Sequence, residues 1–130
     1  MVHYCDTSAL VKLVTAEAET VALRTWLSEA TRELISSDLT RTELMRAVRR
    51  AAPELAQQAR LVLDSIDLIR VSTADFDAAG RLDPVDLRSL DALHLTMAMR
   101  LGDDLESLVT YDERLARAAA QYGVGVSTPG

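Results

Sequence analysis

Four acidic residues stand where the sequence pattern predicts strand ends or helix starts. Asp6 follows an apolar segment of strand type, and Glu43 lies in the first turn of a helical segment. Asp91 opens a strongly apolar helical segment, and Asp112 follows the strand-type segment after it. Clustered carboxylates repel one another, and a divalent cation that prefers oxygen ligands, Mg²⁺ or Mn²⁺, removes that penalty. Because such an ion activates water and stabilises charge on a phosphate, the acids predict hydrolysis of a phosphodiester bond.

Each acid also has a purely structural explanation. Residues 40–43 (Thr-Arg-Thr-Glu) match a helix capping box, and residues 110–113 (Thr-Tyr-Asp-Glu) would cap the last helix. Asp91 suits a helix N-terminus through the helix dipole, and Asp6 suits a turn. The acids count for more together, because all of them fall where the active sites of open parallel sheets form.

The elements that must position these acids alternate between strands and helices. Strands are expected at residues 2–5, 33–37, 67–72 and 105–110, with a short edge strand at 124–126. Helices are expected at residues 9–14, 17–30, 39–51, 73–81, 91–101 and 112–122, with one more opening at Pro53. This alternation predicts an α/β three-layer sandwich with a mainly parallel central sheet. The strand ends of such a sheet share one edge, so the four acids can converge there.

The composition fits one globular domain over residues 1–130, with 48% hydrophobic and 26% charged residues. Cys5 is the only cysteine, which excludes an internal disulfide and a thiolate zinc site and favours a reducing cytoplasm. The first residues lack the pattern of a signal peptide, and no apolar run is long enough for a membrane span.

The charge balance gives a mixed indication about nucleic acid. A net charge of −6 argues mildly against it, because nucleic-acid-binding proteins usually carry a basic surface. Arg41, Arg46, Arg49 and Arg50, however, lie within ten residues and are opposed only by Glu43. This cluster is either a solvated helix face or a phosphate-binding surface, since arginine binds phosphate well.

Four short segments resemble the four motifs of PIN-domain nucleases. They are Asp-Thr-Ser-Ala-Leu at 6–10, Thr-Glu-Leu at 42–44, Leu-Asp-Ala-Leu-His-Leu at 90–95 and Thr-Tyr-Asp-Glu-Arg-Leu at 110–115. Their order and spacing match, and the resemblance covers essentially the whole chain. The size of the chain resembles the VapC toxins of type II toxin–antitoxin pairs.

This resemblance implies a site and its partners. Asp6, Glu43 and Asp91 would bind the metal, Mg²⁺ or Mn²⁺, and Asp112 would complete a catalytic and metal-binding set of four acids. Ser8 and Thr110 would supply supporting hydroxyls. The substrate would be RNA, and the partner a small VapB-like antitoxin that wraps the toxin and blocks its site. A homodimer and a toxin–antitoxin hetero-oligomer are the expected assemblies.

The antitoxin needs a surface on which to dock. The apolar side chains near the N-terminus are too many for all of them to fit one core: Leu10, Val11, Leu13, Val14, Val21, Trp26 and Leu27. We expect some of them to form an exposed groove for an amphipathic helix. The alternative is that they only pack the core.

Other chemistries are disfavoured. A haloacid-dehalogenase-like phosphatase needs a second Asp where Ser8 stands, and a receiver domain needs a carboxylate at the end of the third strand, where residues 69–73 have none. No Gly-x-Ser-x-Gly motif or Walker loop is present. His94 lies inside a buried helical segment and is interpreted as a packed, hydrogen-bonded residue. A non-catalytic RNA- or protein-binding module with the same fold is the remaining alternative.

Overall fold

A five-stranded parallel sheet forms the middle of the protein. The computed structural model describes all 130 residues. The strands are β1 (Val2–Cys5), β2 (Glu33–Ser37), β3 (Asp67–Ile69), β4 (Leu105–Val109) and β5 (Val126–Ser127). Their order is β3-β2-β1-β4-β5, and every neighbouring pair is parallel. The predicted α/β class with a parallel sheet is therefore confirmed, and β1 lies at its centre.

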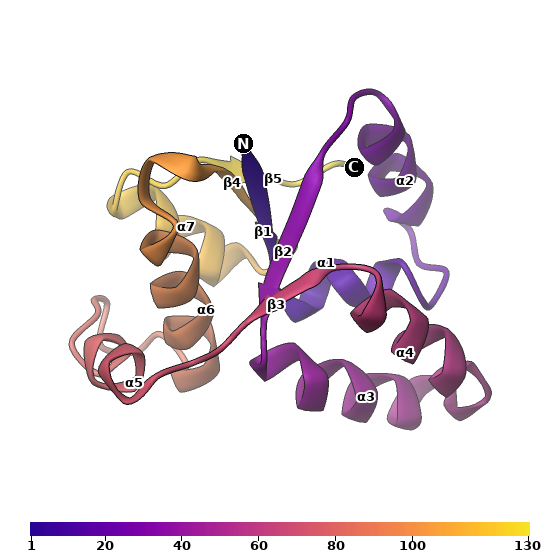
Figure 1. Cartoon of the computed structure of the whole chain (residues 1–130), viewed down its shortest axis with the longest axis horizontal. Coiled ribbons are helices and arrows are strands. Elements are labelled where there is room, and N and C mark those ends of the chain that lie inside the picture. The colour runs from indigo at the N-terminus through magenta and orange to yellow at the C-terminus, as the bar shows by residue number, and fades with distance from the viewer.

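Helices cover both faces of this sheet. They are α1 (Thr7–Lys12), α2 (Thr20–Ser28), α3 (Leu39–Ala51), α4 (Ala56–Asp64), α5 (Thr73–Ala79), α6 (Ser89–Arg100) and α7 (Glu113–Gln121). Figure 1 shows α1 to α4 on one side of the strands and α5 to α7 on the other, which makes the three predicted layers. None of these helices is long and apolar enough to cross a lipid bilayer.

Several element boundaries differ from the predicted ones, and two of the differences matter for the site. Helix α1 begins at Thr7 rather than at residue 9, because the Asp6 side chain accepts a hydrogen bond from Ala9 N and caps the helix. Helix α6 begins at Ser89, so Asp91 lies inside its first turn. Strand β5 begins two residues later than predicted, at Val126.

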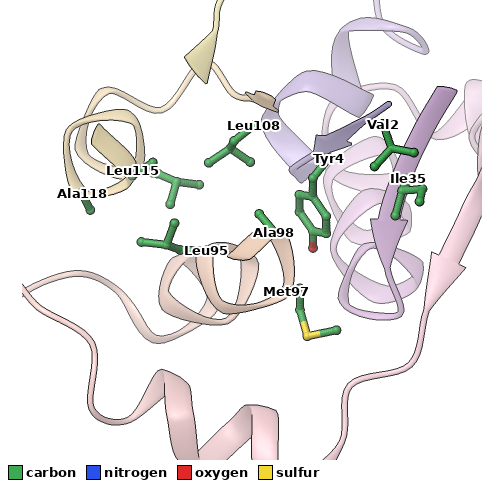
Figure 2. Close-up of a cluster of buried hydrophobic side chains, with 10 residues drawn as sticks. Val2, Tyr4, Ile35, Leu95, Met97, Ala98, Leu108, Leu115 and Ala118 are labelled. Atoms are coloured by element: carbon green, nitrogen blue, oxygen red, sulfur yellow. The ribbon is translucent and has the colours of Figure 1, made fainter. Parts of the chain in front are cut away.

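The core has two main parts, one on each face of the sheet. One part joins β1, β4, α6 and α7, and Figure 2 shows Leu95 and Ala98 with Tyr4, Leu108 and Leu115 in it. The other part lies among β1, α1, α3 and α4. Every residue from Ala92 to Ala98 is buried, as the apolar sequence of α6 predicts. This burial holds the first turn of α6 firmly against the strand ends.

The predicted apolar groove near the N-terminus is not open in the structure. Leu10 is fully buried, and Val11, Leu13, Val14, Trp26 and Leu27 are partly buried against the core. Val21 alone is clearly exposed, at 75%. The short helices α1 and α2 fold back over the core and cover most of these side chains, so the structure favours the alternative that they mainly pack the core.

Candidate active site

Asp6 is held at the end of β1 by a complete set of hydrogen bonds. Ser8 Oγ and Ala9 N donate to its Oδ1 at 2.7 and 3.1 Å, and Thr110 Oγ1 donates to its Oδ2 at 2.6 Å. Asp6 is only 3% exposed. Burial raises the pKa of this carboxyl, and the donors from Ser8, Thr110 and Ala9 oppose that rise. The carboxylate is thus fixed in one orientation.

The two hydroxyls around Asp6 also tie it to the loop after β4. Ser8 Oγ accepts a hydrogen bond from Tyr111 N at 2.9 Å, and Thr110 Oγ1 accepts one from Asp112 N at 3.0 Å. Each hydroxyl therefore bridges the end of β1 and the start of α7. The predicted supporting residues Ser8 and Thr110 do contact Asp6.

Glu43 points back toward the sheet from the second turn of α3. Its Oε1 accepts from Thr7 Oγ1 at 2.9 Å and lies 2.6 Å from His94 Nε2. Burial alone would raise the pKa of Glu43, but the hydrogen bond and charge of His94, helped by Thr7, hold that pKa below its ordinary value. Glu43 is thus kept ionised at the strand ends.

The capping box considered as a structural explanation for residues 40–43 does not form. The N-cap residue of α3 is Asp38, and its side chain makes no capping bond. Thr40 Oγ1 donates instead to the Ser37 carbonyl at 2.7 Å. Because Glu43 is turned inward to His94, it does not close the box, and the structural explanation for this acid fails.

His94 is buried and hydrogen-bonded, as interpreted from the sequence, and it also holds a site carboxylate. Its Nδ1 lies 2.8 Å from Tyr4 Oη, and Tyr4 Oη donates to Ser37 Oγ at 2.8 Å. A chain of polar groups thus runs from Ser37 through Tyr4 and His94 to Glu43. This chain orients the imidazole toward the acid.

Asp91 is half-buried in the first turn of α6, and no group donates a hydrogen bond to its carboxylate. Burial, with repulsion from Asp112, Asp6 and Glu43, raises its pKa to about 6, and only the charge of His94 works in the other direction. The repulsion shows that acids from four distant segments do lie close enough to interact. Asp91 is the point where their negative charge is least compensated.

Asp112 has a structural role in addition to its place near the site. It is the N-cap of α7, where its Oδ1 accepts from Arg114 N and Leu115 N at 2.9 and 3.1 Å. The predicted cap at residues 110–113 is therefore present, with Asp112 rather than Thr110 as the capping residue. Its Oδ2 takes no part in the cap.

The acids converge without forming a closed metal shell. As the side chains lie, no three of the chain's Asp, Glu, His or Cys side chains come close enough to hold one ion. Glu43 is drawn to His94 and Asp112 to the backbone of α7, while like charges keep the carboxylates apart. The Glu43 Oε2, Asp112 Oδ2 and both Asp91 oxygens are engaged in no hydrogen bond. This all-oxygen set, with uncompensated charge, fits a hard divalent cation.

Sequence reasoning missed the contacts that hold Glu43. His94 stands three residues after Asp91 in a helix, a spacing that places both side chains on one face and could have linked the histidine to the acids. Thr7 and Tyr4 carry no comparable signal. Their contacts with Glu43 and His94 depend on how β1, α3 and α6 pack together.

Known proteins share both the sequence pattern and the fold of this chain. The family model described as PIN domain matches residues 3–121. Ribonuclease VapC46 of Mycobacterium tuberculosis is 44% identical over 126 residues, covering 97% of this chain and 96% of the relative. Among solved structures, M. tuberculosis VapC20, described as a Sarcin-Ricin loop cleaving toxin, has a TM-score of 0.75 at 17% identity, covering 89% of this chain and 94% of that one. A toxin-antitoxin complex from Klebsiella pneumoniae has a TM-score of 0.74 at 22% identity, covering 98% of each chain.

Fold and site together define the class: an α/β protein with an acidic site at the carboxyl edge of a parallel sheet. The chain belongs to the PIN domain family. Its four acids lie in the segments that first indicated this resemblance.

Proposed function

We propose that this protein is a metal-dependent ribonuclease that acts as the toxin of a VapBC-type toxin–antitoxin pair. The observation that carries the proposal is the arrangement of Asp6, Glu43, Asp91 and Asp112, from four separate segments, at the carboxyl edge of the sheet, where no group donates a hydrogen bond to Asp91. Burial and repulsion from the other three acids, which raise the pKa of Asp91 to about 6, support it. A buried group of like charges is costly unless a cation neutralises it. The identity of 44% to a relative named as a ribonuclease supports RNA as the substrate.

Asp6, Glu43, Asp91 and Asp112 would hold Mg²⁺ or Mn²⁺. When bound, the ion would supply a water of lowered pKa and stabilise charge on the scissile phosphate. Asp6 is already oriented by Ser8 and Thr110, and Glu43 by Thr7 and His94. Asp91 and the second oxygen of Asp112 are free to turn toward a cation. The chain's own contribution is therefore two fixed carboxylates and two that can adjust.

We also propose an antitoxin as the protein partner. The support comes from the Klebsiella pneumoniae neighbour, which is a toxin-antitoxin complex, and from the relatives named VapC. The expected assemblies remain a homodimer and a hetero-oligomer with a VapB-like protein that covers the acidic site. The alternative, a non-catalytic binding module, is disfavoured because all four acids are present and electrostatically coupled.

The test is RNA cleavage by wild type and Asp91→Asn on matched preparations. Wild type should cleave RNA with Mg²⁺ or Mn²⁺ and lose that activity in a chelator. Asp91→Asn should stay folded and cleave at least about 100-fold more slowly, because metal activation of water is the main catalytic contribution. Asp103→Asn is the control and should cleave like wild type, because Asp103 is exposed and lies before the start of β4, at the opposite end of that strand from the acids. A folded Asp91→Asn protein with full activity would exclude the proposed mechanism.

A further inference from the structure

Five exposed arginines on two helices have no acidic partner. The ion pairs that arginines do form involve Arg32, Arg41 and Arg100. Among the arginines without an ion pair, five are grouped on these two helices: Arg46, Arg49 and Arg50 on α3, and Arg114 and Arg117 on α7. In a chain of net charge −6, such concentrations of unpaired positive charge point to an anionic ligand.

The α3 arginines extend from the site along one helix face. Arg46 and Arg50 follow Glu43 by three and seven residues, a spacing that places all three on the same side of α3. With Arg49 they are the only residues lining a surface hollow of about 250 Å³. The hollow contains no apolar side chain, which makes it a poor protein-docking surface and a good one for a charged group.

The α7 arginines lie just beyond Asp112. Arg114 and Arg117 are one turn apart and line a hollow of about 330 Å³. Asp86 lines the same hollow but forms no ion pair with either. Arg114 stands in the first turn of α7, where the helix dipole disfavours a cation. Stabilisation of the helix therefore does not explain this residue, although it could explain Arg49 and Arg50 at the last turn of α3.

The two groups of arginines flank the acidic site. Helix α3 follows β2 and helix α7 follows β4, and these strands lie on either side of β1, which ends at Asp6. Figure 1 shows α3 and α7 on opposite sides of the sheet, with the strand ends between them. An extended chain that crosses the strand ends from α3 to α7 therefore passes from one group to the other over the carboxylates.

We propose that Arg46 and Arg50 on one side, and Arg114 and Arg117 on the other, bind backbone phosphates of single-stranded RNA on both flanks of the bond to be cut. This inference rests on the proposed function and adds the path of the substrate. Arginine forks suit phosphate oxygens, and Arg50 lies roughly 10 Å along α3 from Glu43.

An acidic protein surface is the other ligand that five arginines could bind. RNA is favoured because the two groups lie on helices that begin next to the strand ends, α3 with Glu43 in its second turn and α7 with Asp112 as its N-cap. A partner that only docks would not need positive charge on two sides of a hydrolytic site.

The experiment compares three double variants that each remove two charges. Arg46→Gln/Arg50→Gln and Arg114→Gln/Arg117→Gln test the two flanks. Arg60→Gln/Arg81→Gln is the matched control, because both residues are exposed, form no ion pair and line neither hollow. Binding of a short fluorescent single-stranded RNA is measured by anisotropy in a chelator, at salt concentrations from about 50 to about 200 mM. Thermal melting verifies that each variant is folded.

Each flank variant should bind the RNA about 10- to 30-fold more weakly at about 0.1 M salt. The slope of the logarithm of the binding constant against the logarithm of the salt concentration should become less steep by about 1.4, because each of the two lost phosphate contacts contributes about 0.7. The control should keep the wild-type slope. Unchanged affinity in both flank variants overturns the inference and assigns the arginines to an acidic protein. An equal loss in the control, or a loss at one flank only, also overturns it. Failure of the proposed function is a separate result, since it means that wild type with Mg²⁺ cleaves no RNA.

Discussion

Asp6 and Asp91 are two acids of one site that the protein holds in opposite ways. Asp6 accepts hydrogen bonds from Ser8, Ala9 and Thr110, and it caps α1. Asp91 accepts none and is placed only by the backbone of α6, of which residues 92–98 are buried. The pKa of both is raised, at Asp6 by burial against opposing donors, and at Asp91 by burial with added repulsion from its neighbours.

Folding alone supplies all the hydrogen bonds that hold the Asp6 carboxylate, but it leaves the charge of Asp91 without a compensating group. The hydrogen bonds of Asp6 join β1 to the loop after β4, so its carboxylate is part of the folded structure. The carboxylate of Asp91 makes no hydrogen bond within the fold, and its repulsion from the neighbouring acids raises the free energy of the folded state when it is charged. If the site binds a cation, as proposed, the fixed carboxylate of Asp6 would define the position of the ion, and the uncompensated charge of Asp91 would favour its binding.

The largest expected effect is an opposite change in stability when each carboxylate is removed. Without metal at pH 7, Asp6→Ala should lower the free energy of unfolding by about 2 kcal/mol, because a helix cap is lost and the buried Thr110 hydroxyl loses its acceptor. Asp91→Ala should raise it by about 1 kcal/mol, because relief of repulsion outweighs a small loss of favourable dipole interaction. Urea unfolding of both variants measures the difference. Destabilisation of the same size in both would show that Asp91 also has a structural partner.

A smaller effect follows from the pKa of Asp91, about 6 in the folded protein against 3.8 as its ordinary value. Between these values the folded state binds more protons than the unfolded state, so the contribution of Asp91 to stability falls as pH rises from about 4 to about 6 and is constant above. Asp91→Asn removes this dependence. The variant should match wild type near pH 4 and be more stable by about 1 to 2 kcal/mol at pH 7, after discounting for solvent screening.

Thermal melting across this pH range, in a chelator, tests the prediction. Since Asp6 also has a raised pKa and is unchanged in the variant, the comparison of the two proteins isolates Asp91. Adding Mg²⁺ should stabilise wild type more than Asp91→Asn and so reduce the gap. A stability gap that is constant from pH 4 to pH 7 would contradict the charge argument.

The sequence could predict those features that depend on local pattern and on the order of elements along the chain. Alternation of strands and helices predicted the parallel sheet, and the edge rule for such sheets predicted that Asp6, Glu43, Asp91 and Asp112 converge. These inferences depend on local periodicity and on chain order. The apolar sequence of α6 likewise predicted its burial, since it has no polar face to expose.

What the sequence could not predict depends on side-chain directions between distant elements. The segment at residues 40–43 fits a capping box by spacing alone, yet Glu43 turns to His94 across 51 positions of sequence. The N-terminal apolar residues suggested a groove because the sequence does not reveal how many side chains can pack between the core and helices α1 and α2. Local rules also misplaced the start of α1, because they did not recognise Asp6 as its cap.

The smallest expected effect distinguishes the two hydroxyls that hold Asp6. Thr110 is 1% exposed, and Thr110→Val would leave both Asp6 Oδ2 and Asp112 N without this partner, where water cannot easily replace it. We expect a loss of about 1 to 2 kcal/mol in the free energy of unfolding. Ser8 makes an equivalent pair of bonds but is only partly buried, so water can compensate in Ser8→Ala, and the loss should be about 0.5 to 1 kcal/mol. Ser65→Ala is the control, because its exposed hydroxyl donates only to the nearby Val62 carbonyl and should leave stability within about 0.5 kcal/mol of wild type. A larger loss in Ser8→Ala than in Thr110→Val, measured by urea unfolding, would mean that Oδ1 rather than Oδ2 is the oxygen that fixes Asp6.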